Sequence, residues 1–261
     1  MVSVSLKISV LHLFSAFGLL VGAGKAWATA AALPQESSLD ILSLRSLLFV
    51  VGAGGLAGVI STFVRRRYAL IKRGMDIFLS AFGLLLVSPL LAVAAVLIRT
   101  TSPGPAFYAQ ERLGKNGKIF RMLKLRTMVL DAERATGPVW AKLDDPRVTP
   151  VGRLLRKTRF DEVPQLINIL RGQMSLIGPR PERPEIASRL SQKVKDYPRR
   201  LAVLPGITGL AQVWNQYDET IEDVRRKVKY DLLYIRQMCL TADFGILFRT
   251  VYVVFSGQGS H

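Results

Sequence analysis

The chain has 261 residues and a formal net charge of +17, and 49% of its residues are hydrophobic. This composition excludes intrinsic disorder, and the length allows one or two domains. The single cysteine, Cys239, excludes an internal disulfide framework, while His12 and His261 are too few for a histidine-based triad or zinc cluster. We therefore expect any chemistry to depend on carboxylates, arginine and lysine.

The N-terminal part of the chain is rich in apolar stretches. The first stretch, 8–23, is flanked by lysines and followed by the small-x-small sequence Ala-Trp-Ala, so residues 1–28 fit both a cleaved signal peptide and a retained first helix. The second, about 47–64, has no charged residue and predicts a transmembrane helix. Its glycines have GxxxG spacing, which in a glycine-rich apolar helix mostly arises by chance but is also compatible with a homodimer. We predict that residues 1–64 form an N-terminal membrane anchor region.

A third apolar block, 77–98, is long enough to span a membrane. Basic residues flank it on both sides, at 65–73 and from Arg99 onward, and the positive-inside rule places both flanks in the cytoplasm. Ser88-Pro89 lies at its centre, where proline removes a helical hydrogen bond and Ser88 can satisfy the freed carbonyl. We predict a re-entrant helix broken at this dipeptide; a proline-kinked spanning helix is the alternative.

Residues 65–261 hold nearly all of the positive charge. Such a surface beside a bilayer attracts anionic lipid headgroups or phosphate-bearing substrates. We expect these residues to form the catalytic domain. The predicted fold class is a mainly α membrane protein, with an N-terminal anchor helix or helices, the re-entrant broken helix, and a small cytoplasmic α+β part that includes a β-hairpin.

Local patterns predict the elements of this cytoplasmic part. Asn116-Gly117 between two strand-like runs predicts the hairpin. Thr149-Pro150 has the pattern of a helix N-cap and first turn. A second helix is predicted to follow Asp161 and to end at Gly172, with the following buried stripe: Leu166, Ile167, Ile169, Leu170. Two further segments have the pattern of basic amphipathic helices that are either solvated or interfacial: 185–203 and 218–238.

Asp161-Glu162 is the leading candidate for chemistry. Alone, an acidic pair at a helix start is ordinary capping. Here, however, several cations precede it within fifteen residues: Arg147, Arg153, Arg156, Lys157, Arg159. Cations and the helix N-terminus favour an ionised, nucleophilic Asp161. The side chains of successive residues diverge, so Glu162 can help hold a hard divalent ion such as Mg²⁺ together with substrate phosphates.

Three further cations are candidates for phosphate binding. Arg180, in Gly-Pro-Arg-Pro, is presented by a rigid elbow and suits bidentate phosphate contact, although a surface proline turn fits the same pattern. Lys124 and Arg126 alternate on the second hairpin strand and are expected to share a face. Without further context, these two side chains fit a solvent-facing role equally well.

A series of motifs occurs in order along the chain: Lys-Arg-x-x-Asp at 72–76, Ser-Pro at 88–89, Ser-Pro-Gly-Pro-Ala-Phe-Tyr at 102–108, Gln-Glu-Arg-x-Gly at 110–114, Lys-Leu-Arg-Thr-Met at 124–128, Arg-x4-Asp-Glu-x-Pro-Gln-Leu at 156–166, Met-Ser-Leu-Ile-Gly-Pro-Arg-Pro at 174–181, Pro-Gly-Ile-Thr-Gly-Leu-Ala-Gln at 205–212 and Asp-x-x-Tyr at 231–234. Through them, residues 72–250 resemble the bacterial sugar transferase family. These are monotopic polyprenyl-phosphate phosphoglycosyl transferases of the kind that initiates exopolysaccharide synthesis.

The resemblance implies a membrane enzyme that moves a sugar 1-phosphate from a UDP-sugar to undecaprenyl phosphate and releases UMP. It implies that Asp161 is the nucleophile, that Glu162 is its partner near Mg²⁺, and that the catalytic part faces the cytoplasm at the bacterial inner membrane. The matching phosphate-contacting arginines are Arg156 and Arg180. Lys124 and Arg126 lie in a motif associated with the active-site face.

The sequence also departs from the family pattern and leaves choices open. Gln173 is neutral where some relatives carry an acid, and the region before the catalytic core is shorter than in the larger members. Galactose, glucose and N-acetylated or deoxyamino sugars all remain candidate substrates. A different class of function is a non-catalytic membrane anchor that binds acidic polysaccharide or lipid. A nucleic-acid binder explains neither the apolar blocks nor the sparse aromatic residues.

Overall fold

The computed structural model describes the backbone of residues 41–132, 145–214 and 220–255, with side chains from residue 66 onward. Two compact units divide the chain, Met1–Ile60 and Ser61–His261. The predicted segment 1–28 lies outside the described residues. The predicted transmembrane helix at 47–64 falls within a stretch of helical backbone. All interactions described below lie within the second unit.

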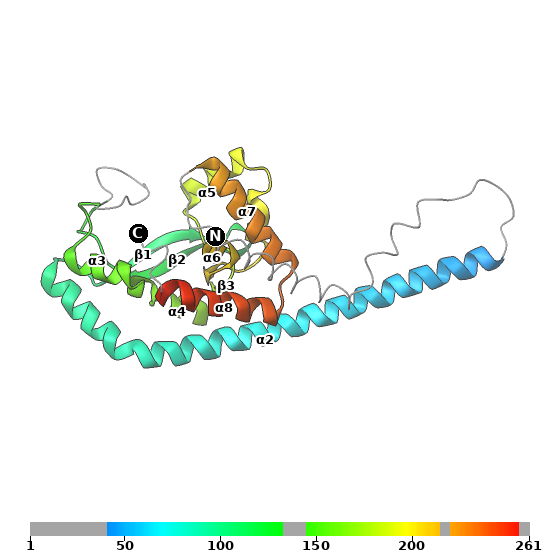
Figure 1. Ribbon diagram of the computed structural model, residues 1–261, viewed down its shortest axis with the longest axis horizontal. Coiled ribbons are helices and arrows are strands. Elements are labelled where there is room, and N and C mark those ends of the chain that lie inside the picture. The colour runs from blue at the N-terminus through cyan, green and yellow to red at the C-terminus, as the bar shows by residue number, and fades with distance from the viewer. Residues whose placement is uncertain (1–40, 133–144, 215–219, 256–261) are drawn as a thin grey trace, which may run out of the picture. The chain divides into compact units, whose positions relative to one another are not determined.

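Helix α2 runs without interruption from Ile41 to Thr101 and curves toward its C-terminal end (Figure 1). The predicted break in helical structure at Ser88-Pro89 is therefore wrong. Pro89 removes only the hydrogen bond to the carbonyl four residues earlier, that of Leu85. Ser88 Oγ donates to this same carbonyl at 2.8 Å, as the sequence predicted for the freed group. The backbone is thus satisfied, and the helix continues through the proline.

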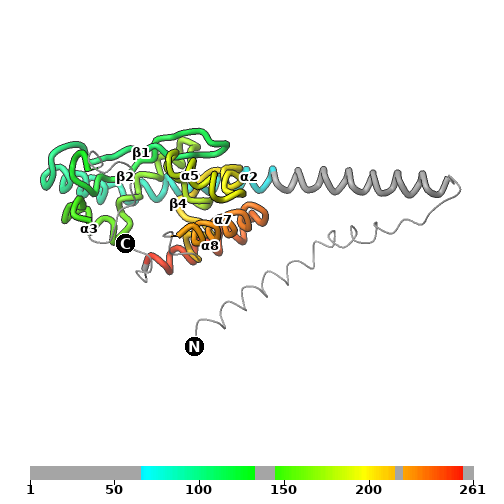
Figure 2. The backbone as a smooth tube through the Cα atoms, turned by 90° about the horizontal axis from the view of Figure 1, so that it is seen from above, coloured from blue at the N-terminus to red at the C-terminus, as the bar shows by residue number. Residues whose placement is uncertain are grey.

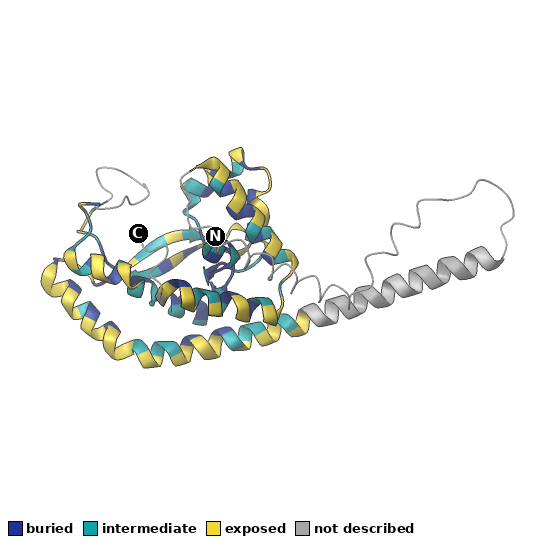
Figure 3. Cartoon of the chain, in the orientation of Figure 1, coloured by how far each residue is buried: buried dark blue, intermediate teal, exposed yellow. Residues whose placement is uncertain are grey.

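The stretch Arg66–Thr101 of α2 is the one helix within the described residues that is long and apolar enough to cross a membrane. Only 17% of its most apolar window is buried, which is unlike the core helix of a soluble protein. One face packs Leu91, Ala94 and Ile98 against Leu125 and Leu155 of the rest of the unit. Figure 3 shows exposed residues along much of the rest of α2 from residue 66 to its end. The helix thus combines a protein-facing stripe with an exposed apolar face.

The β-hairpin is confirmed. Strands β1, Phe107–Leu113, and β2, Ile119–Leu125, pair antiparallel with Phe107 opposite Leu125. A short 3₁₀ turn, η2 at Lys115–Gly117, joins them, and Asn116 and Gly117 both have positive φ. Asparagine and glycine tolerate this backbone conformation best, which explains why this dipeptide predicts the turn.

Helix α3, Pro150–Lys157, begins as predicted, since the Thr149 side chain accepts a hydrogen bond from the Gly152 amide. The chain continues through η3, Phe160–Glu162, and α4, Gln165–Leu170. Strand β3, Ser175–Ile177, pairs in parallel with β4, Gly206–Thr208. Helix α8, Leu240–Phe255, contacts both of these strands. The other elements of this part, of which Figure 2 labels α5 and α7, are α5 at Pro184–Lys193, η4 at Tyr197–Ala202, α6 at Leu210–Trp214 and α7 at Ile221–Arg236.

Two of the predicted helices differ from the structure. The segment 185–203 is not one amphipathic helix, because α5 ends at Lys193 and η4 follows after a non-helical linker. The predicted apolar stripe of the helix after Asp161 is also wrong in part. Its most buried side chains are Ile169 and the two amides Gln165 and Asn168. Asn168 explains this, because its Nδ2 donates to the Arg121 carbonyl of β2 and its Oδ1 accepts from the Leu123 amide.

Three charged side chains of one α2 turn attach this helix to α4, β3 and α8. Arg73 donates to the carbonyls of Ile169 and Leu170 at the end of α4, at 2.7 and 3.1 Å. Asp76 accepts from the amide of Leu176 in β3 at 3.0 Å. Lys72 forms a 3.0 Å ion pair with Asp243 of α8, which is completely buried. The Lys-Arg-x-x-Asp motif is therefore a structural connection.

Candidate active site

A sharp turn presents Asp161 and Glu162. Helix α3 ends at Lys157, and Arg159 adopts a left-handed conformation with φ 55° before η3 begins. Such a conformation is uncommon for a residue other than glycine. The predicted helix does follow Asp161, but α4 begins only at Gln165, because the 3₁₀ turn η3 holds the acidic pair. The predicted end of that helix is correct, since Gly172 has a φ of +76°.

Glu162 lies between two of the predicted cations. Its Oε1 accepts from Arg180 at 2.5 Å and from Lys124 at 3.2 Å, and its Oε2 lies 3.4 Å from a second Arg180 nitrogen. Burial would raise the pKa of Glu162, but the charges of Arg180 and Lys124 outweigh it and hold this pKa well below its usual range. The same carboxylate raises the pKa of Arg180. Strand β2 and the segment after β3 thus each direct a cation to the ionised Glu162 of η3.

Asp161 has different surroundings. Its side chain is only 8% exposed, and its carboxylate makes no hydrogen bond or ion pair with any residue that the structure describes. Burial raises the pKa of Asp161, with a further contribution from Glu162, although Lys124, Arg156 and Arg180 oppose the shift. The expectation that cations alone keep Asp161 ionised therefore needs correction, because desolvation outweighs them. What results is a carboxylate with free lone pairs and increased basicity.

Arg156 is the one predicted α3 cation that points toward the site. Its Nε donates to Thr127 Oγ1 at 2.9 Å, and its charge acts on Asp161. Arg153 and Lys157, two more of the cations that precede the acidic pair, are exposed. Burial lowers the pKa of Arg156, and the charge of Asp161 partly opposes this shift.

Arg126 lies away from the acidic pair. Strand β2 ends at Leu125, so Arg126 does not continue the face that carries Lys124. Its guanidinium donates to the carbonyls of Ser102 and Pro103 at 2.7 and 2.5 Å, just after α2 ends. These contacts are typical of an arginine that supports the chain, and they leave Lys124 as the cation that β2 directs to Glu162.

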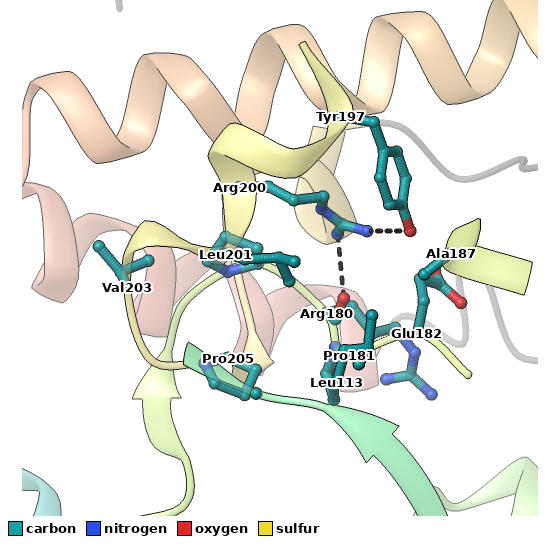
Figure 4. Close-up of a pocket in the computed structure, with 12 residues that line it drawn as sticks. Leu113, Arg180, Pro181, Glu182, Ala187, Tyr197, Arg200, Leu201, Val203 and Pro205 are labelled. Atoms are coloured by element: carbon teal, nitrogen blue, oxygen red, sulfur yellow. Dashed lines mark hydrogen bonds between the residues drawn. The ribbon is translucent and has the colours of Figure 1, made fainter. Parts of the chain in front are cut away.

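The elbow that carries Arg180 is held by backbone contacts. The amide of Gly178 donates to Thr208, and the amide of Gly206 donates to Pro179, at 2.9 and 3.0 Å. A Cβ on Gly206 would lie 2.1 Å from the Gly178 nitrogen, so only glycine allows this approach. Figure 4 shows Arg200 donating to the Arg180 carbonyl, at 3.0 Å, and to the Tyr197 hydroxyl. The pocket in that view, of about 10 Å³, has space for about one water molecule.

Comparison with known proteins identifies the family of this chain. Residues 67–257 match the family model for bacterial sugar transferase. The chain belongs to the bacterial sugar transferase family.

Several curated proteins are similar to this sugar transferase. It is 42% identical over 193 residues to the UDP-N-acetylgalactosamine-undecaprenyl-phosphate N-acetylgalactosaminephosphotransferase of Aeromonas hydrophila, covering 74% of the chain and 45% of that protein. It is 50% identical to a putative undecaprenyl-phosphate N-acetylgalactosaminyl 1-phosphate transferase of Bacillus subtilis, covering 52% and 75%. It is 40% identical to the UDP-glucose:undecaprenyl-phosphate glucose-1-phosphate transferase of Escherichia coli, covering 74% and 42%. The chain thus spans less than half the length of two of these relatives.

The carboxylates of Asp161 and Glu162 are too few to bind Mg²⁺ without further ligands from a substrate. Within the described residues, no three acidic, histidine or cysteine side chains gather into a metal cluster. Asp161 has free lone pairs, and Glu162 keeps lone-pair capacity beyond the bonds to its two cations. Mg²⁺ is commonly held by one or two carboxylates together with substrate phosphates, so the acidic pair fits this ion in that mode.

Two buried ion pairs lie behind Arg180, and the sequence did not predict them. Glu182 binds Lys227 at 2.9 Å, and Arg200 binds Asp231 at 2.8 Å. The Asp-x-x-Tyr motif indicated that Asp231 is important. Its partner Arg200, however, is 31 residues away and belongs to no motif that would have indicated the pairing. Gln173, the neutral departure, accepts from the Asn168 side chain at 2.7 Å and so helps to hold α4.

Proposed function

We propose that this sugar transferase moves a sugar 1-phosphate from a UDP-sugar to undecaprenyl phosphate, releasing UMP, as the first membrane step of exopolysaccharide or glycan synthesis. The observation that carries the proposal is the site around Asp161. A buried carboxylate without a hydrogen-bond partner among the described residues lies next to three cations, and a second carboxylate neutralises part of their charge. This arrangement suits a nucleophile that must approach an anionic diphosphate.

In the first step, an ionised Asp161 oxygen attacks the β-phosphorus of the UDP-sugar, which carries the sugar. A bond forms between the aspartate oxygen and this phosphorus, the bond from the phosphorus to the bridging oxygen breaks, and UMP leaves with the electron pair. Arg156, Arg180 and Lys124 stabilise the charge that develops on the phosphate oxygens. Arg126 supports the end of α2 instead of contacting phosphate.

In the second step, a phosphate oxygen of undecaprenyl phosphate attacks the phosphorus of the phosphosugar-aspartyl intermediate. The bond to Asp161 breaks, and the carboxylate is regenerated as the sugar-carrying diphosphate lipid leaves. Because UMP departs before the lipid reacts, the two substrates use one site in turn, which predicts ping-pong kinetics.

Glu162 acts as an electrostatic partner in this scheme. Its low pKa keeps it ionised, so it holds Arg180 and Lys124 in place throughout the cycle. Mg²⁺, held by Asp161 and Glu162 with the donor phosphates, would supply additional charge neutralisation on the diphosphate.

The proposed location is the bacterial inner membrane, with the catalytic part on the cytoplasmic side. The exposed apolar face of α2 supports contact with lipid.

We further propose that the 77–98 part of α2 dips into the bilayer and returns, because basic residues flank both of its ends and the helix curves. Cysteines at the exposed positions Leu70 and Lys115, in a Cys239→Ala background, should both be labelled from the cytoplasmic side only. Labelling on opposite sides would indicate a crossing helix.

A UMP-release assay on membranes with a panel of UDP-sugars tests the function. The relatives are named for N-acetylgalactosamine, glucose and galactose phosphate transfer, so these three donors are tested first. We expect release with at least one donor and none with Asp161→Asn. Undiminished turnover by Asp161→Asn would contradict the proposed nucleophile. UMP release by no donor would favour the non-catalytic anchor that binds acidic polysaccharide or lipid.

A further inference from the structure

A cavity of about 210 Å³ lies beside the candidate nucleophile and is separate from the pocket in Figure 4. Arg159 and Glu162 line its polar part. Most of the remaining wall is aliphatic and comes from four elements and the linker before α4: Val163, Leu166, Ile207, Val213, Val253, Val254. Its volume is below the roughly 300–1,000 Å³ of pockets that enclose a drug-sized ligand. The cavity therefore suits one apolar part of a larger ligand whose charged group lies near Glu162.

The cavity borders two apolar surfaces. Leu166 of its wall lies against α2, where a Cβ on Gly83 would be 3.6 Å from Leu166 Cδ1. Helix α8 supplies Val253 and Val254, and its outer surface exposes Phe248 and Val251. The cavity wall is thus continuous with apolar side chains of α8 and lies against α2, the helix with the exposed apolar face.

Most polar side-chain atoms of the cavity wall already have hydrogen-bond partners within the protein. Thr208 and Thr250 share a 2.7 Å hydrogen bond between their hydroxyls, and Thr250 also donates to the Ile246 carbonyl. Gln212 Nε2 donates to the Ile207 carbonyl at 2.8 Å. The occupant therefore needs few polar atoms of its own, which favours a hydrocarbon over a sugar or a ribose.

We propose that this cavity binds the first isoprene units of the polyprenyl phosphate acceptor and directs its phosphate toward Arg159 and the catalytic acids. The proposal rests on the proposed function and adds the position of the lipid chain. Charge complementarity supports it, because Arg159 lies in the polar part and Arg180 and Lys124 neutralise Glu162 from outside the cavity. Branched aliphatic side chains line most of the remainder.

Val254→Trp tests the proposal by filling the cavity from its rim. Val254 is 43% exposed, so the larger side chain can be placed without disrupting the core. The matched control is Val251→Trp, because Val251 is 54% exposed on the same helix but does not line the cavity. We expect Val254→Trp to raise the KM for undecaprenyl phosphate at least tenfold and to leave the burst of UMP release unchanged. The control should change neither.

The donor KM is measured in parallel, because Gln212 Oε1 has no hydrogen-bond partner among the described residues and could accept from a nucleobase. A raised KM for the UDP-sugar with an unchanged acceptor KM would assign the cavity to the donor and overturn the proposal. Unchanged values for both substrates in Val254→Trp would overturn it as well.

Crosslinking of the unmodified protein gives an answer that does not depend on turnover or on variant folding. The probe is a polyprenyl phosphate that carries a diazirine in its second isoprene unit. We expect its crosslinks at 163–166 and 250–254, and crosslinks confined to the outer face of α2 would refute the cavity site. Absent UMP release together with crosslinks at the cavity would reject the proposed catalysis but retain the lipid site, so the two failures are distinguishable.

Discussion

Asp161 and Glu162 are adjacent in the chain, but their carboxyl groups have opposite pKa shifts. Glu162 is bound by Arg180 and Lys124, which lower its pKa despite burial. Asp161 has no such bonds within the described residues, and burial raises its pKa. Two acids with separated pKa values are a common basis for dividing roles within an active site. Here the division is between an ionised glutamate that holds two cations and a buried aspartate of increased basicity that acts as the nucleophile.

The raised pKa of Asp161 predicts the pH dependence of the first half-reaction. Only the ionised form attacks phosphorus, so the rate should fall with decreasing pH at values above the ordinary pKa of aspartate. Lys124 lowers the pKa of Asp161, and its removal in Lys124→Met should therefore move this acidic limb to still higher pH. Burst rates of UMP release across a pH series measure the shift. A limb that stays in place in Lys124→Met would show that Lys124 does not act on Asp161.

The same shift predicts a gain in stability when Asp161 is neutralised. A group whose pKa is raised by folding contributes stability at low pH, and this contribution is lost as pH rises through the raised value. Asp161→Asn should therefore abolish UMP release while keeping or raising the Tm at pH 7. Asp196→Asn, at an exposed position, is the control and should leave the Tm unchanged. A clear loss of Tm in Asp161→Asn would mean that the carboxylate has a structural role.

Arg180 should contribute more than a point charge. Its fork contacts both oxygens of Glu162, and we expect it to contact donor phosphate as well. Arg180→Ala should reduce kcat/KM for the UDP-sugar by about 10²-fold or more, and Arg180→Lys should restore only part of the loss. Arg199→Ala is the control, because Arg199 is exposed on the neighbouring η4. Full activity of Arg180→Lys would show that charge alone suffices.

Asp76 should stabilise the junction between α2 and β3. It accepts from the Leu176 amide, and Asp76→Ala leaves that amide unsatisfied, at a cost of about 1–3 kcal/mol in the free energy of unfolding. Asp76→Asn keeps an oxygen acceptor and should lose much less. Thermal unfolding in detergent compares the two. Equal losses would indicate that the charge of Asp76 matters and not its hydrogen bond.

Local signals predicted the hairpin and the start of α3 well. The hairpin turn requires positive φ angles, which Asn116 and Gly117 adopt. The Thr149 side chain accepts a hydrogen bond from an amide of the first turn of α3, and Pro150 fixes the backbone angle φ at its first position. Both depend on a few neighbouring residues, so the sequence contains the whole cause. The predicted break at Pro89 failed although its local cause was visible in the sequence. The bond from Ser88 to the freed Leu85 carbonyl satisfies the backbone, so the helix continues through the proline.

The site was predicted in composition but not in arrangement. Asp161, Glu162, Arg180 and Lys124 meet as expected, whereas Arg126 binds backbone carbonyls near the end of α2. Strand alternation could not reveal this, because β2 ends one residue before Arg126. The ionisation of Asp161 was also misjudged, since the number of nearby cations is visible in a sequence but the extent of desolvation is not.

The central claim is that Asp161 becomes covalently linked to a sugar phosphate. Intact-protein and peptide mass spectrometry, after incubation with each UDP-sugar in the absence of lipid acceptor, measures this directly. The account predicts a mass increase of one sugar phosphate, located on Asp161, that is lost on adding undecaprenyl phosphate and absent in Asp161→Asn. A preparation that releases UMP from a donor but carries no adduct at Asp161 would contradict it.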